Sequence, residues 1–405
     1  MKRLITIFSV LAIASTFLFA CSPARSVRSG PAVCKSDSVG CAVIKPGQTV
    51  KIGMGAPMTG DNAAFGLDIS QAAIMAMADA GAFQGFKFEL VAQDDGGSAE
   101  GGASVANKLV SDPTVVAIEG HIFSGATVAA IPIYEKASLP MLSPSATVAT
   151  LTTTGSKVFN RNVFTDAIQG KFAAGYLYNK LKSKNLAIMH DGQAYGQGLA
   201  QNVSDVFKQL GGNVVAFQPI TPGESDYTSV LADIASKKPD AIFYGGYTAE
   251  AAVLVNQMGQ SGLSGVTFFS DDGIYGVDFL TRTKQNGAGA YSTSPVPAPS
   301  DASKKFDAAY LAKYGKAPGS LSPYTYTAYD AGAVLVKAIE SVAVLGDDGN
   351  LYIPRGALIA AVRATKDYQG LSGTITCDST GECSASGPTF YKDDGSQWVA
   401  VGTGS

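Results

Sequence analysis

Residues 114–137 read TVVAIEGHIFSGATVAAIPIYEKA and contain the repeating unit of the fold. TVVAI is apolar and rich in β-branched residues, which is typical of a buried strand, and the end of the segment is typical of a helix. The first N–H groups of a helix lack internal partners, and the helix dipole makes them attractive to an anion. Ser124 lies where this helix begins, so its hydroxyl either caps the helix or helps to hold the negative charge of a ligand.

The same alternation of strand-like and helix-like segments continues along the chain. Eight strands are predicted within the first 272 residues, with helices between them. Such alternation is typical of βαβ units with parallel sheets. Eight strands are too many for one compact unit, so we expect an α/β fold of two doubly wound, Rossmann-like lobes with a central cleft. The predicted strands are 49–55, 87–93, 114–120, 139–144, 185–190, 213–219, 240–246 and 266–272, and the predicted helices are 67–82, 100–112, 125–137, 169–183, 196–211, 226–238 and 250–262.

Composition and motifs argue against several functions. The chain has 405 residues, a formal net charge of −3 and 16% charged residues, and its pI is about 5.5. It has no basic block, so we expect no nucleic-acid-binding surface. The two histidines, His121 and His190, raise the alternative of a hydrolase that uses Ser124. No G-x-S-x-G motif surrounds that serine, and no glycine pair completes a dinucleotide fingerprint. We therefore expect no enzyme, no cofactor and no bound metal.

The N-terminus predicts export. A positive start is followed by an apolar stretch that is too short for a transmembrane helix, as in a secretory signal. Because Leu18-Phe19-Ala20-Cys21 resembles the lipobox of bacterial lipoproteins, we expect residues 1–20 to be a lipoprotein signal peptide and Cys21 to be lipidated. Residues 21–47 would form a flexible tether, and the protein would be periplasmic or at the cell surface, anchored to a membrane. An ordinary signal peptide or a buried core segment is the alternative.

The four remaining cysteines predict disulfides. An even number of cysteines in an oxidising compartment favours disulfide bonds, and four cysteines allow three connectivities. Closing a short loop costs the chain less entropy than closing a long one, so we favour Cys34–Cys41 and Cys377–Cys383. A zinc site is the alternative, but these spacings do not match the usual short cysteine pairs.

The residues that follow the predicted strands suggest a zwitterionic ligand. In open α/β sheets, ligands bind beyond the carboxyl ends of the strands. Glycines and hydroxyls follow the early strands and suit a carboxylate, whereas aromatic residues and carboxylates follow the later ones. Asp271 and Asp272 are candidates to pair with an ammonium, and Tyr195, Tyr247 and Tyr324 are candidates to wall an apolar side chain. The ordinary alternatives are a turn for the aspartates and interior packing for the tyrosines.

A series of motifs resembles the periplasmic leucine/isoleucine/valine-binding proteins of ABC importers. The motifs are GMGAPMTGDNAAFG, VAQDDGGS, EGHIFSGAT, LPMLSPSAT, HDGQAYGQGLA, FYGGY and YQGLSGTITCD, in family order from about residue 49 onward. The resemblance implies that Ser124 contacts the ligand carboxylate, that Ser145 contributes through its backbone, and that Asp272 pairs with the ammonium. The ligand-binding residues that it implies are Phe65, Ile122, Phe123, Ser124, Ser145, Ala146, Thr147, Tyr195, Tyr247, Asp272 and Tyr324.

The chain departs from the leucine-binding branch at four of these positions. Asp272 stands for a glutamate, so the carboxylate is one methylene shorter. Phe123 stands for a disulfide cysteine, Ser145 adds a hydroxyl, and Phe65 lacks the hydroxyl of a tyrosine. An aliphatic amino acid is the expected ligand. Aromatic or small polar amino acids and a short amide such as urea remain alternatives, as does a ligand-sensing module without transport.

The resemblance also implies how the lobes are connected. Three crossovers are expected near residues 165, 293 and 345. Lobe 1 is then expected to comprise residues 48–165 and 293–345, and lobe 2 residues 166–292 and 346–405. A ligand that contacts both lobes favours their closed arrangement. The closed protein, a monomer, is expected to dock on the membrane permease of an importer that also has an ATPase subunit.

Overall fold

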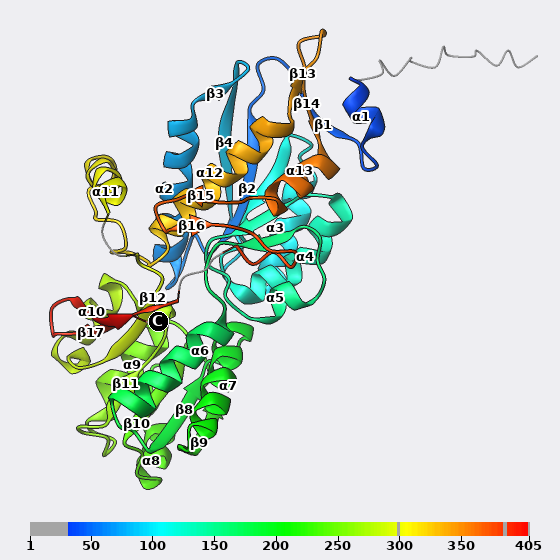
Figure 1. The fold of residues 1–405 in the computed structure, drawn as a ribbon. Coiled ribbons are helices and arrows are strands. Elements are labelled where there is room, and N and C mark those ends of the chain that lie inside the picture. Colours follow the sequence, from blue (N-terminus) through cyan, green and yellow to red (C-terminus); the bar gives the residue numbers. More distant parts are fainter. Residues whose placement is uncertain (1–30, 298–299, 384–386, 404–405) are drawn as a thin grey trace, which may run out of the picture.

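The computed structural model describes residues 31–297, 300–383 and 387–403, and it has the expected α/β architecture of two lobes (Figure 1). Each lobe is built around one mostly parallel sheet. The sheet of lobe 1 has the strand order β3-β4-β2-β5-β6-β7, and that of lobe 2 has the order β18-β17-β12-β11-β10-β8-β9. All eight predicted strands are present within these two sheets, so the prediction of two doubly wound lobes is confirmed.

Lobe 1 has helices on both faces of its sheet. Residues of α2 and α12 pack on one face, and residues of α3 and α4 pack on the other. The strands are β2 (Val50–Ala56), β3 (Ala82–Phe83), β4 (Phe86–Asp94), β5 (Val115–Glu119), β6 (Met141–Ser143) and β7 (Phe159–Arg161). The helices are α2 (Ala63–Ala80), α3 (Ala99–Val110), α4 (Ser124–Ala137), α5 (Thr150–Thr153), α11 (Asp301–Tyr314), α12 (Thr325–Val342) and α13 (Arg355–Arg363).

Lobe 2 repeats this plan. Its strands are β8 (Asn185–His190), β9 (Asn213–Pro219), β10 (Ala241–Gly245), β11 (Thr267–Phe269), β12 (Tyr291–Ser294), β17 (Thr389–Asp393) and β18 (Trp398–Thr403). Its helices are α6 (Asp166–Gly175), α7 (Ala194–Gln209), α8 (Thr228–Ser236), α9 (Thr248–Met258) and α10 (Val277–Thr283), with the short helical turns η1 (Tyr176–Lys180), η2 (Asp272–Ile274) and η3 (Lys284–Gly287). The last two strands run antiparallel to their neighbours and form one edge of the sheet.

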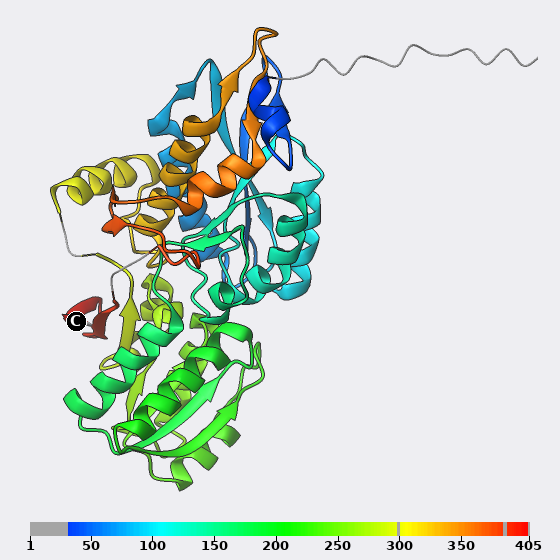
Figure 2. The ribbon, with the colours of Figure 1, turned by 45° about the vertical axis from the view of Figure 1, so that its right-hand side comes forward.

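The order of the strands in each sheet determines where the cleft lies. In lobe 1 the order reverses beside β2, which pairs with β4 on one side and β5 on the other. In lobe 2 it reverses beside β8, which pairs with β9 and β10. The loops after these strands diverge to opposite faces of each sheet and leave a crevice at its carboxyl end. The carboxyl ends of the two sheets face each other where the lobes meet (Figure 2).

The chain passes between the lobes three times, but the third crossover was expected in the wrong place. It passes from β7 to α6 and from β12 to α11, and it returns to lobe 2 only after residue 383, at β17. The segment 346–383 therefore belongs to lobe 1 and not to lobe 2 (Figure 1). Leu358 and Val362 of α13 are buried in the core of lobe 1, and Arg363 donates a hydrogen bond to the carbonyl of Phe159.

The expected tether is also partly wrong, because residues from 31 onward are folded. They form α1 (Ala32–Ser36) and β1 (Cys41–Ile44), and β1 pairs with β14 (Leu351–Pro354) beside β13 (Val344–Leu345). Ile44 is fully buried against lobe 1, which explains why this segment is ordered. Asp37 accepts hydrogen bonds from the first N–H groups of α13. The signal peptide and Cys21 lie outside the described residues.

Both predicted disulfides, Cys34–Cys41 and Cys377–Cys383, are present. The second one closes a loop that follows the small hairpin of β15 (Tyr368–Gln369) and β16 (Thr374–Ile375) and lies against the end of β7. Along the described part of the chain, no helix is long and apolar enough to cross a membrane.

Arg161, at the end of β7, connects this disulfide loop to the turn after β6. Its side chain is fully buried and forms an ion pair with Glu382, with 2.5 Å between nitrogen and oxygen. The same guanidinium donates hydrogen bonds to the carbonyls of Ala146 (3.2 Å) and Val148 (2.8 Å). One buried cation thereby holds together two segments that are more than 200 residues apart.

We predict that Arg161→Met destabilises the protein by about 3 kcal/mol, because it leaves a carboxylate and two buried carbonyls without their charged donor. Denaturant unfolding measures this loss. The control is Arg282→Met, which removes exposed ion pairs with Asp61 and Asp278 and should cost about 1 kcal/mol or less. Equal losses for the two variants would contradict the structural role of Arg161.

Candidate ligand-binding cleft

A small cavity lies between the lobes, where the loops after their central strands meet. Its accessible volume is about 10 Å³, room for about one water molecule, so the walls lie close together and would have to move apart to admit a larger ligand. All of the side chains that line it are buried. Eight of the eleven residues predicted from the sequence form its wall: Phe65, Ile122, Phe123, Ser124, Ser145, Tyr195, Tyr247 and Tyr324. The other three, Ala146, Thr147 and Asp272, do not line it.

Aromatic rings from both lobes pack around the cavity. The ring of Phe123 in lobe 1 stacks on that of Tyr247 in lobe 2, with 4.2 Å between centroids and an angle of 3°. Phe65 contacts both rings edge-on. The centroid of the Tyr195 ring lies 5.3 Å from that of the Tyr247 ring. Gly97 allows this arrangement, because a Cβ there would come within 2.7 Å of the Phe123 ring. The lobes are therefore in a closed arrangement in this structure, with an apolar wall shared between them.

Ser124 does not cap its own helix. It is the first residue of α4, the preceding Phe123 occupies the N-cap position, and no side chain caps this helix. Instead, the Ser124 Oγ accepts a hydrogen bond of 3.2 Å from the backbone N–H of Val148, in the turn after β6. The alternative of a capping serine is thus wrong. The hydroxyl hydrogen has no acceptor among the described residues, so it can be donated to a ligand carboxylate.

The turn after β6 contributes backbone groups to the cleft more than side-chain groups. The Ser145 hydroxyl donates to the carbonyl of Ile122 at 2.7 Å, so it is already used within lobe 1. Ala146 is held at both ends, because its N–H donates to Ser143 Oγ and its carbonyl accepts from Arg161. Thr147 differs, since its buried hydroxyl makes no hydrogen bond of good geometry in the described chain but lies close enough to Asp166 to lower the pKa of that carboxyl.

The two adjacent aspartates have different roles. Both oxygens of Asp271 accept backbone hydrogen bonds, from the N–H groups of Gly246 (3.0 Å) and Gly273 (2.9 Å). It therefore stabilises two turns, as the ordinary alternative proposed. One oxygen of Asp272, Oδ1, accepts from the Tyr195 hydroxyl at 2.8 Å and from Gln169. The other, Oδ2, is buried and lacks a partner within the described residues. Burial raises the pKa of both carboxyls.

Sequence reasoning missed Gln169 and its helix neighbour Asp166. Gln169 donates to Asp272 and, at 2.6 Å, to Thr293 Oγ1. Asp166 is fully buried at the start of α6, directly after the first crossover. Neither residue follows a predicted strand. The expected crossover near residue 165 was the one signal that could have drawn attention to them.

The histidines do not form a hydrolytic site with Ser124. His121 Nδ1 lies 2.7 Å from Asp95 Oδ2, and its Nε2 lies 2.9 Å from the Tyr134 hydroxyl, all within the core of lobe 1. His190 Nδ1 accepts from the N–H of Gly192, and burial lowers the pKa of its imidazole. Within the described residues, no group of three or more His, Cys, Asp or Glu side chains is placed to hold a metal ion.

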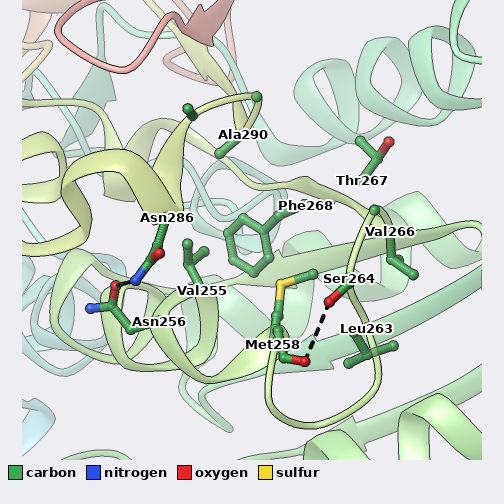
Figure 3. Close-up of a pocket in the computed structure, with 14 residues that line it drawn as sticks. Val255, Asn256, Met258, Leu263, Ser264, Val266, Thr267, Phe268, Asn286 and Ala290 are labelled. Atoms are coloured by element: carbon green, nitrogen blue, oxygen red, sulfur yellow. Dashed lines mark hydrogen bonds between the residues drawn. The ribbon is translucent and has the colours of Figure 1, made fainter.

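A second hollow lies at the opposite end of the lobe 2 sheet, beside the starts of β11 and β12 (Figure 3). Three of its polar side chains are paired with protein groups, since Asn286 donates to Asn256 at 2.9 Å and Ser264 donates to the carbonyl of Gly259 at 3.3 Å. The described residues that line it include no charged side chain. It therefore offers nothing to pair with the two charges of a zwitterion.

Comparison with known proteins shows the family to which the chain belongs. The family model described as periplasmic binding protein matches residues 49–385. The Leu/Ile/Val-binding protein homolog 1 of Brucella abortus (strain 2308) is 29% identical over 85% of this chain and 90% of its own length. The Leu/Ile/Val-binding protein of Escherichia coli (strain K12) is 34% identical over 61% of this chain and 68% of its own length.

Solved structures show the same fold. The leucine-binding protein LivK of Thermotoga maritima superposes with a TM-score of 0.78 and 29% identity, covering 88% of this chain and 99% of that one. The branched-chain amino-acid transporter substrate-binding protein LivJ of Streptococcus pneumoniae, in complex with isoleucine, has a TM-score of 0.76 and 28% identity, covering 87% of this chain and all of that one. The chain therefore belongs to the periplasmic binding protein family, and its relatives there include the Leu/Ile/Val-binding proteins.

Proposed function

We propose that this protein captures an amino acid with an aliphatic side chain by closing its two lobes around it. The observation that carries the proposal is the interlobe cavity, which is lined on one side by Ser124 at the start of α4 and on the other by Tyr195, whose hydroxyl donates to the buried Asp272. The relatives named above as branched-chain amino-acid binders support the same ligand class. The proposed function requires binding alone, with no chemical reaction at the site.

Lobe 1 would hold the ligand carboxylate. Because α4 begins at Ser124, which lines the cavity, the N-terminal end of its dipole lies at the cleft and favours an anion there. The Ser124 hydroxyl can donate to the same carboxylate without giving up its bond from Val148. Thr147 does not line the cavity, and its hydroxyl lies beside the Asp166 carboxyl, so it is not assigned to this carboxylate. Together the start of α4 and the Ser124 hydroxyl bind an anion without a basic side chain.

Lobe 2 and the aromatic wall would hold the rest of the ligand. Asp272 Oδ2 is free to accept from the ammonium. Phe65, Tyr195 and Tyr247 present buried rings to the cavity, so an aliphatic side chain placed there would lose its contact with water. A ligand that touches both lobes stabilises their closed arrangement by its difference in affinity for the two states.

The wider role in transport is part of the same proposal. The closed protein would deliver its ligand to the permease and ATPase subunits of an ABC importer. Cys21 would be lipidated and would anchor a monomer outside the cytoplasm, at a membrane. Mass spectrometry of the mature protein tests the anchor, since an unmodified Cys21 would remove it from the proposal.

A thermal-shift screen against the common amino acids, urea and short amides tests the ligand class. A ligand that binds only the native state stabilises it by mass action, by about 2.7 kcal/mol when present at 100 times its Kd. We expect leucine, isoleucine or valine to raise the melting temperature and urea to leave it unchanged. A shift with urea or an amide alone would overturn the amino-acid assignment.

We predict that Asp272→Asn weakens amino-acid binding at least tenfold, because a hydrogen bond to a charged group contributes about 1.5–3 kcal/mol. Isothermal titration calorimetry measures the Kd. The matched control is Asp330→Asn, another buried aspartate, whose carboxyl accepts from Leu371 and Ser372 away from the cleft. If Asp272→Asn binds as tightly as the control, Asp272 does not pair with the ammonium.

Ser124→Ala should weaken binding about tenfold and also lower stability by about 1 kcal/mol, because the buried N–H of Val148 loses its acceptor. Calorimetry and denaturant unfolding separate the two effects. Ser70→Ala, which removes a buried hydroxyl of α2 bonded to a carbonyl of its own helix, is the control and should leave the affinity unchanged. A loss of stability with unchanged affinity would make Ser124 a purely structural residue.

A further inference from the structure

The short helix α10 of lobe 2 contacts lobe 1 at both of its ends. At its start, the backbone N–H of Val277 donates to the carbonyl of Ser320, in the loop before α12, at 2.8 Å. Near its end, the guanidinium of Arg282 pairs with Asp61, in the loop before α2, at 3.1 Å. Neither loop is one of the three crossovers. These two contacts therefore join the lobes directly and not through the covalent connections between them.

The start of α10 lies very close to lobe 1. A Cβ at Gly276 would lie 3.0 Å from the carbonyl oxygen of Leu321, which is tighter than an ordinary van der Waals contact. The backbone of Gly276 is extended, with a φ of 160°, so other residues could adopt its conformation. The absence of a side chain at this position therefore serves the close approach of the two lobes.

The helix α10 is held firmly to lobe 2. The Nε1 of Trp398, in the edge strand β18, donates to the carbonyl of Gly276 at 3.2 Å. The ring of Trp398 also stacks on that of Phe279, which is fully buried. Because α10 moves with lobe 2, its contacts with Ser320 and Asp61 would have to break when the lobes separate.

The Arg282 side chain is oriented before it meets lobe 1. Its Nε donates to Asp278, one turn earlier in α10, at 2.8 Å. The side chains of Arg282 and Asp61 are 37% and 66% exposed, so their pair adds little to the stability of the fold. A contact that exists in only one of two arrangements still shifts the balance between them. The pair therefore favours the closed arrangement.

These contacts adjoin the wall of the cleft. The helix α10 follows the turn η2, which begins at Asp272. Ser320 lies shortly before Tyr324, and Asp61 shortly before Phe65, and both of these aromatic residues line the cavity. A movement of α10 away from lobe 1 is therefore coupled to a movement of the cavity wall.

We propose that α10 is a clasp that forms when the lobes close, and that its contacts with Ser320 and Asp61 set how long a captured ligand stays bound. This inference rests on the proposed function, because it needs a ligand that leaves only after the lobes open. It assigns a kinetic role to Asp61, Gly276 and Arg282, which are not among the described residues that line the cavity. The clasp slows release and has little effect on entry, which occurs while the lobes are open.

Salt should weaken the clasp. The Debye length falls from about 30 Å at 0.01 M salt to about 3 Å at 1 M, so an exposed ion pair is screened. Asp272 is fully buried and is screened much less. Release from the wild type should therefore become faster as the salt concentration rises, and Arg282→Gln should lose most of this dependence.

Release of a radiolabelled amino acid tests the inference, with the amino acid that gives the largest thermal shift and an excess of the unlabelled form as chase. We expect Arg282→Gln and Asp61→Asn each to release it about two- to fivefold faster than the wild type at low salt, as for an exposed ion pair. The double variant should release it no faster than either single variant. Gly276→Ala should speed release at least about fivefold, because overpacking a tight contact is unfavourable.

Two matched controls should release the ligand at the wild-type rate. Lys237→Gln removes an exposed ion pair with Asp233 within lobe 2. Gly175→Ala adds a Cβ that meets no other atom within 4 Å.

The outcomes separate the two proposals. If no amino acid binds the wild type, the proposed function fails. If an amino acid binds and the Asp61, Arg282 and Gly276 variants all release it at the wild-type rate, the clasp is wrong and the proposed function stands. Slower entry with unchanged release would also contradict the clasp. If Gly276→Ala does not fold, the two ion-pair variants and their salt dependence decide.

Discussion

The carboxyl ends of two parallel sheets face each other across the cleft, and this arrangement constrains the rest of the structure. Each lobe reverses its strand order beside a central strand, so each leaves a crevice at the same edge of its sheet. Lobe 1 brings helix N–H groups and hydroxyls to that crevice, and lobe 2 brings carboxylates. Under the proposed function, neither half alone would pair both charges of a zwitterion. The two halves meet at the stack of Phe123 on Tyr247.

The site loops need support that lies outside the cleft. The turn after β6 carries Ser145 and Thr147, and its carbonyls are held by Arg161. Arg161 is in turn paired with Glu382 in the disulfide loop. The late segment 346–383 thus belongs to lobe 1 for a physical reason, since it supplies the counter-ion that a buried guanidinium requires. The small N-terminal sheet extends this support, because β1 pairs with β14 of the same segment.

Short-range sequence patterns correctly predicted the strands, whose formation depends mainly on neighbouring residues. The eight strands are short, apolar and β-branched, and all of them are present. The residues at their carboxyl ends could be placed at the cleft because strand ends converge in any open α/β sheet, although their roles came from the resemblance. Prediction failed where long-range contacts decide. The position of segment 346–383 depends on contacts such as that between Arg363 and Phe159, and the fold of residues 31–47 depends on β14. Gln169 and Asp166 carry no local signal, because their relation to Asp272 spans about 100 residues.

The buried carboxyls also explain how recognition is coupled to closure. The first turn of α6 touches both halves of the site, since Asp166 bonds to Thr147 of lobe 1 and Gln169 bonds to Asp272 of lobe 2. In the closed arrangement these carboxyls are removed from water, which disfavours their ionised forms and raises their pKa values. Closure around no ligand therefore requires a carboxyl to take up a proton or to remain buried as an unpaired charge. Under the proposed function, the ammonium of a bound amino acid would pair with Asp272 and remove part of this penalty, which a neutral amide would not do.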